Sequence, residues 1–295
     1  MVLPPILTRL VLVLSMAFAA HPLAAQTRPA PGGGEPPVVA PGVQIAALGE
    51  AMRIADVIAV MREEGLQYGS SLEAELFPDR GGPRWQAVVG LIYDADTMRK
   101  RFDAFFEAEV GRDPGAIAGM LDFFGSERGQ RILQLEIEAR RALLDESAEE
   151  AAKIKVEDMS ARNDPRLDLL QEFAEANDLI ELNVAGALNS NLAFYRGMAE
   201  GAAFDEALSE EQMLADVWSQ EGDVRRETEE WLYPYLALAY GPLSDSDLRD
   251  YIAFSRTPEG RRLNGATFAA FDAVFSAISH DLGRAAAKQM QGEDI

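Results

Sequence analysis

The side chains that most often carry catalysis are scarce in this chain. It has no cysteine, and His21 and His280 are its only histidines. Thiol catalysis and disulfides are therefore excluded, and too few ligands remain for a zinc centre. Residues 125–129 read Gly-Ser-Glu-Arg-Gly, which lacks the spacing of the Gly-x-Ser-x-Gly nucleophile turn. The sequence thus predicts no catalytic residue, no metal and no cofactor, and it favours a protein that is not an enzyme.

Carboxylates are too numerous to mark a site by themselves. Asp245, Asp247 and Asp250 lie close together, but the glycine and the distal glutamate of a calcium loop are missing. We expect them in the first turn of a helix, where the helix dipole favours negative charge. Carboxylate pairs of the glycosidase kind meet only in space, so a carboxylate-dependent hydrolase stays an alternative.

Three asparagines, Asn183, Asn189 and Asn191, fall within one predicted helix. Asparagine is a poor helix former, because its side chain competes for the backbone hydrogen bonds. Asn183 and Asn191 lie roughly on one helical face. Three interpretations are open, namely a polar cleft between the long entry helix and the second helical hairpin, a hydrogen-bonded network between helices, or plain surface.

The elements that would position these groups show an internal repeat. Residues 120–132 are echoed without a gap by residues 251–263. The corresponding positions are Phe123 with Phe254, Ser126 with Thr257, Gly129 with Gly260, and Arg131 with Arg262. Ser126 and Thr257 are expected to cap the following helix, Pro258 to preset its first turn, and the glycines to allow a close helix–helix corner. The repeat predicts an all-α helical bundle, built from two similar multi-helix units that share a core.

Residues 244–278 carry a recognisable pattern. An acidic N-cap stretch is followed by Leu248, Tyr251, Ile252, Phe254 and then Thr257-Pro258-Glu259-Gly260. This arrangement resembles the bacterial family called domain of unknown function 2059. The resemblance implies a secreted, all-helical protein and supplies no catalytic residue. The chain departs from the pattern at Glu127, where the first copy should have proline, and at Ser255, where a second aromatic is usual.

Helix formers and cap signals predict helices almost throughout, from Ile45 onward. The expected helices cover residues 45–76, 85–92, 95–110, 114–125, 127–157, 166–201, 209–221, 223–240, 245–255 and 258–289. The first helical unit is expected at 45–160, and the second, with the family-like motif, at 161–295.

The N-terminus has the features of an export signal. Arg9 precedes an apolar run over residues 10–20, and small residues follow. We expect a signal peptide at 1–25 and a disordered tether, rich in proline and glycine, at 26–44. An N-terminal membrane anchor is the alternative, although the run is short for a span. The predicted location is the periplasm of a Gram-negative bacterium, or outside the cell, with no stable membrane span in the mature chain.

The net charge of −22 argues against nucleic acid as a partner. The sequence favours a non-enzymatic binding or envelope-assembly factor, whose partner is an unknown envelope protein or a small ligand. An apolar-ligand carrier is an alternative, because an apolar stripe runs along one face of the last predicted helix. Its members are Phe268, Phe271, Phe275, Ile278 and Leu282.

Overall fold

The computed structural model describes residues 40–78, 80–204 and 208–292. Of these residues 86% are helical and none is in a strand, which confirms the all-α class. The helices are α1 (Pro41–Ala51), α2 (Ile54–Leu76), α3 (Gly82–Ile92), α4 (Ala95–Val110), the 3-10 helix η1 (Pro114–Ala116), α5 (Ile117–Phe124), α6 (Glu127–Ala142), α7 (Glu146–Ala161), α8 (Pro165–Ala176), α9 (Leu179–Glu200), α10 (Glu210–Ser219), α11 (Glu221–Tyr240), α12 (Asp245–Ser255) and α13 (Pro258–Gln291).

The predicted signal peptide lies outside the described residues, as does most of the tether. Residues 41–44, however, belong to α1, which corrects the tether's predicted end. The physical reason is that Pro41 stands at the first helical position. The missing N–H of a proline costs nothing there, and its fixed φ suits the helix.

Two of the long predicted helices are each broken in the middle. The span 45–76 is divided at Arg53, and the span 166–201 at Asp178. Both residues adopt a left-handed conformation, with φ of 56° and 53°. Neither break carries a local glycine or proline, so the periodic pattern continues through it. Neither residue caps the following helix with its side chain, so no capping signal marks the break.

The predicted helix at 127–157 is also two helices. Asp145 interrupts it, because its carboxylate accepts hydrogen bonds from the N–H groups of Ser147 and Ala148 at 2.9 and 3.1 Å. The carboxylate thereby caps α7. Helix α7 lies between the two repeated units and has no counterpart in either.

The two units repeat the same set of helix neighbours. Helix α1 packs on α5 as α8 packs on α12, and α2 packs on α3 as α9 packs on α10. In the same way, α2 contacts α4 as α9 contacts α11, and α5 contacts α6 as α12 contacts α13. The predicted pair of similar units is therefore present, as α1–α6 and α8–α13.

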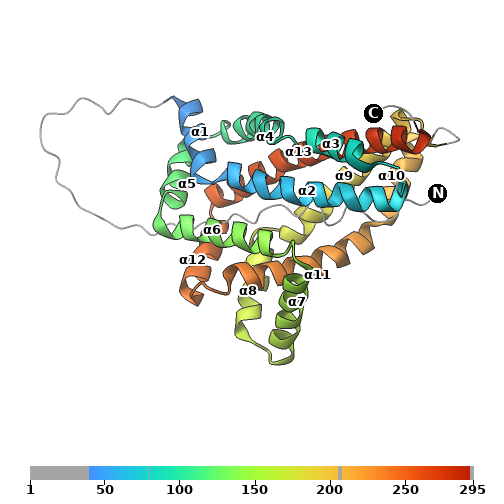
Figure 1. Ribbon diagram of the computed structural model, residues 1–295. Coiled ribbons are helices and arrows are strands. Elements are labelled where there is room, and N and C mark those ends of the chain that lie inside the picture. The colour runs from blue at the N-terminus through green and yellow to red at the C-terminus, as the bar shows by residue number, and fades with distance from the viewer. Residues whose placement is uncertain (1–39, 79, 205–207, 293–295) are drawn as a thin grey trace, which may run out of the picture.

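The units interlock and share one core. Helix α4 of the first unit packs along α13 of the second, while α11 of the second packs along α6 of the first. Figure 1 shows α4 and α13 on one side of α2, and α6 and α11 on the other. The two long exit helices, α6 and α13, pack mainly against other helices. Each is covered by a helix of the other unit, and α13 also by α9.

The repeated corners are built alike. The hydroxyl groups of Ser126 and Thr257 each accept the N–H of the glycine three residues on, at 3.0 Å. A Cβ atom at Gly129 would lie 2.4 Å from the carbonyl oxygen of Phe123, and one at Gly260 would lie 2.2 Å from that of Phe254. Both glycines therefore admit the preceding helix.

The two corners also touch each other. The rings of Phe123 and Phe254 stack with their centroids 5.5 Å apart and their planes at 23°. Arg128, at the start of α6, pairs with Asp247 and Asp250 of α12 at 3.0 and 2.9 Å. The predicted acidic cluster at the start of α12 thus serves partly as a contact between the units.

Candidate functional site

The buried face of α6 carries two charged side chains. Glu136 is 0% exposed and Arg140 is 3% exposed, although apolar side chains surround them on the same face. These neighbours are Ile132, Leu133 and Ile137. A buried carboxyl or guanidinium is costly unless it is paired, so both groups need an explanation.

Glu136 is held by two tyrosines of the second unit. The hydroxyl groups of Tyr240 and Tyr251 each donate a hydrogen bond of 2.6 Å to its Oε1. Its Oε2 has no hydrogen-bond partner among the described residues. Burial raises the pKa of Glu136 to about 8, and the two tyrosine hydrogen bonds offset only part of that rise. The carboxyl group is therefore mainly protonated at neutral pH.

Arg140 is neutralised by a carboxylate from α2. Its Nε and Nη2 donate to the two carboxylate oxygens of Glu64, at 2.5 and 2.7 Å. Such a two-pronged pair is the strongest arrangement for a buried arginine. Tyr235 of α11 is buried near both Glu136 and Arg140. Burial raises its pKa, ionisation of Glu136 raises it further, and Arg140 lowers it.

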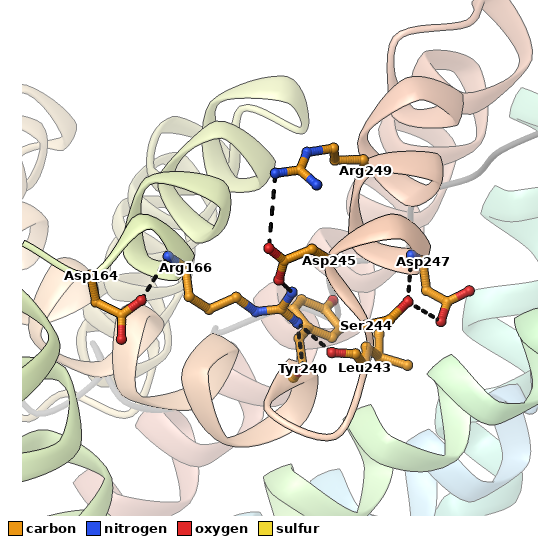
Figure 2. A network of polar contacts seen from close by, with 8 residues as sticks. All are labelled: Asp164, Arg166, Tyr240, Leu243, Ser244, Asp245, Asp247 and Arg249. Carbon is orange, nitrogen blue, oxygen red and sulfur yellow. Dashed lines mark hydrogen bonds and ion pairs between the residues drawn. The ribbon is translucent and has the colours of Figure 1, made fainter.

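A second arginine holds the end of α11 that carries Tyr240. The Nη2 atom of Arg166 donates to the carbonyl oxygens of Tyr240 and Leu243 at 2.7 and 3.0 Å, and its Nη1 to Asp245 at 2.6 Å. Figure 2 shows this guanidinium between α8 and the turn before α12. Lys155 of α7 likewise donates to the carbonyl of Ala237 at 2.9 Å. The free carbonyls at this helix end are thus satisfied by side chains.

A pocket opens beside the buried cluster, where α2, α6, α7 and α11 meet. Its volume is about 250 Å³. The lining side chains include Glu64, Tyr68, Arg140, Leu144, Glu146 and Trp231. The Arg140–Glu64 pair forms part of the pocket wall. It also lies next to the buried residues Tyr235 and Glu136.

The equivalent contact in the other half of the molecule is apolar. By the constant separation of the repeat, Arg140 corresponds to Phe271, whose ring lies 4.6 Å from that of Phe102 on α4. At this position the α4–α13 contact therefore has two packed aromatic rings, whereas the α6–α11 contact has the charged cluster. Because well-packed apolar side chains stabilise such a contact at least as well, stability alone does not account for the buried charges.

The asparagines proposed as a polar cleft make separate contacts. The Nδ2 of Asn183 donates to Leu179 in its own helix at 2.7 Å. Asn189 donates to Asp272 of α13 at 3.0 Å, and Asn191 to Gln220 at 3.2 Å. Asn189 and Asn191 thus join α9 to residues outside it, whereas the bond from Asn183 to Leu179 lies within α9.

The buried cluster was missed in the sequence because charged residues were assigned to the surface. The signal was present on α6, since the apolar residues that flank Glu136 place it on the inward face. The tyrosines gave no such signal, because they follow about a hundred residues later.

No helix within residues 40–78, 80–204 and 208–292 has the length and apolar character needed to cross a membrane. Comparisons with protein-family models, with curated proteins and with solved structures found no match.

Proposed function

We propose that this protein is a non-enzymatic binding factor of the bacterial cell envelope, and that it binds a small ligand in the pocket between α2, α6, α7 and α11. The observation that carries the proposal is the contrast between the two halves. At the position where the α4–α13 contact has Phe271 packed on Phe102, the α6–α11 contact has the buried Arg140–Glu64 pair, which forms part of the wall of an open pocket. Sites that orient a small ligand combine apolar walls with a few polar groups in this way.

The two alternatives have less support. An apolar-ligand carrier would use the space around Phe268, Phe271 and Phe275, but these side chains are buried in the core, and Phe271 packs against Phe102. A carboxylate-dependent hydrolase would need a carboxylate facing its substrate. Glu64 lines the pocket but is engaged by Arg140, and Glu136 is enclosed by tyrosines.

The envelope location is supported by the sequence features of residues 1–25 and by the resemblance of residues 244–278 to a secreted family. Export is tested by N-terminal sequencing of the protein from a periplasmic extract, which we expect to begin near Gln26 or Ala20. An intact Met1 in the membrane fraction would contradict the proposal.

Ligand binding is tested by native mass spectrometry of the protein isolated from periplasmic extract. We expect a bound small molecule, and we expect Leu144→Trp to remove it, because an indole at this half-buried position fills the pocket. Leu91→Trp is the matched control, since Leu91 is 75% exposed and lies outside the pocket. Absence of any bound molecule, or equal binding by both variants, would overturn the proposal.

A further inference from the structure

We infer that the ligand of this pocket is a compact organic cation, a primary or quaternary ammonium compound, recognised by Trp231 and by the carboxylate of Glu146. This inference rests on the proposed function and names the chemical class of its ligand.

The charges around the pocket leave one carboxylate in excess. The guanidinium of Arg140 is matched by Glu64. Glu149, which also lines the pocket, pairs with Lys153 at 2.7 Å. Glu146 has no ion-pair partner among the described residues, and the net charge of −22 raises the local concentration of cations. The pocket is thus electrostatically suited to a positive ligand.

The aromatic wall points to the same class. Trp231 lies parallel to Tyr235, with ring centroids 4.9 Å apart and planes at 12°. That stack fixes the indole on its inner side, while the side chain remains partly exposed and lines the pocket. A cation over an indole face is attracted by the ring quadrupole, and Leu143 and Leu144 offer apolar contact for methyl or methylene groups.

A buried tyrosine forms part of the pocket wall. Tyr68 lines the pocket and is only 9% exposed, and its hydroxyl has no hydrogen-bond partner among the described residues. Burial raises the pKa of Tyr68, and the nearby charge of Glu75 adds to that rise, so the group stays a neutral phenol.

An anionic ligand fits the pocket less well. It would need the guanidinium of Arg140, but two of its N–H groups already bind Glu64, and breaking that pair would leave a carboxylate uncompensated. The volume of about 250 Å³ also favours a small molecule over a peptide or an acyl chain.

The test is isothermal titration calorimetry of the mature full-length protein with three probes. These are choline, putrescine, and the uncharged isostere of choline in which carbon replaces the nitrogen. We expect at least one of the two cations to bind and the isostere to bind at least tenfold more weakly. Glu146→Gln and Trp231→Leu should each weaken cation binding by about 3- to 30-fold, the range of a desolvated cation–π contact or an ion pair.

Matched controls separate recognition from loss of fold. Glu157→Gln removes an exposed carboxylate from the same helix as Glu146, and Trp218→Leu removes the exposed tryptophan of α10. Both should bind the cation like the wild type. Glu146 is exposed, so its replacement leaves the packing intact, and circular dichroism verifies the fold of Trp231→Leu.

The outcomes distinguish this inference from the proposed function. Failure of both cations to bind, an isostere as tight as choline, or unchanged binding by Glu146→Gln overturns the cation class. If Leu144→Trp displaces a co-purified molecule that is neutral or acidic, the proposed binding function stands although the cation class is wrong.

Discussion

At the scale of single residues, Glu136 is the least expected group in the molecule. It is a fully buried carboxyl whose Oε1 accepts two tyrosine hydroxyls, while its Oε2 has no hydrogen-bond partner within the described residues. Its neutral form is favoured, because burial penalises the charge more than two hydrogen bonds can stabilise it. The two tyrosine hydrogen bonds to Oε1 join the residue to the second unit.

We predict that Glu136→Gln changes how stability depends on pH. The folded pKa of about 8 lies above the ordinary 4.5, so the folded state retains a proton that the unfolded state loses between these values. The contribution of Glu136 to stability is therefore complete below about pH 4.5 and declines as the pH rises to about 8. A glutamine stays neutral throughout. As the pH rises from about 4.5 to about 8, the free energy of unfolding of Glu136→Gln should therefore increase relative to that of wild type by on the order of a few kcal/mol.

Urea unfolding at about pH 5 and about pH 8 measures this difference. Glu138→Gln is the control, because Glu138 lies exposed on the same helix. A pH profile shared by wild type and Glu136→Gln would contradict the predicted neutral carboxyl group.

At the scale of elements, the two corners show how a local motif determines a tertiary contact. A hydroxyl cap starts the second helix, and a glycine one turn later lets the carbonyl of the first helix approach. Phe123 and Phe254 then stack across the junction of the two units. The same short pattern therefore turns the chain and joins the halves.

We predict that Gly260→Ala destabilises the protein by about 1–3 kcal/mol, because its methyl group would lie 2.2 Å from the carbonyl oxygen of Phe254. Gly265→Ala, in the same helix, meets nothing within 4 Å. It should be neutral or stabilising by up to about 1 kcal/mol, since alanine has the higher helix propensity. Thermal and urea unfolding compare the two variants. Equal stability of both would show that the corner is not tight.

At the scale of the whole molecule, each unit depends on a helix of the other unit to cover part of its core. Helix α13 completes the core around α4, and α11 completes it around α6. The buried apolar side chains accordingly form one cluster that spans both units. Neither half has a separate core of its own.

We predict that Phe271→Ala lowers the stability of both units together. Phe271 is fully buried against Phe102 of the other unit, so its truncation should cost about 3–5 kcal/mol. Hydrogen exchange should show that amide protection in α4 and in α13 is lost in one step. Phe105→Ala removes a half-exposed ring from α4 and should cost about 0.5 kcal/mol or less. Separate unfolding of the two helices would contradict the shared core.

The sequence by itself determined the helical class, most helix starts and the internal repeat. These depend on interactions between residues a few positions apart, such as the caps at Ser126 and Thr257 and the close contacts at Gly129 and Gly260. Such contacts form wherever the local residues allow them. The repeat predicts a long-range feature, the pair of similar units, because the same local pattern occurs twice in the chain.

Only the tertiary structure decided the rest. The bends at Arg53 and Asp178 are marked by no adjacent glycine or proline and by no side-chain cap. The burial of Glu136 and Arg140 depends on partners far along the chain, in Tyr240, Tyr251 and Glu64. A charged side chain is acceptable in the core only when distant groups neutralise or hydrogen-bond it, and which groups meet is set by how the units interlock.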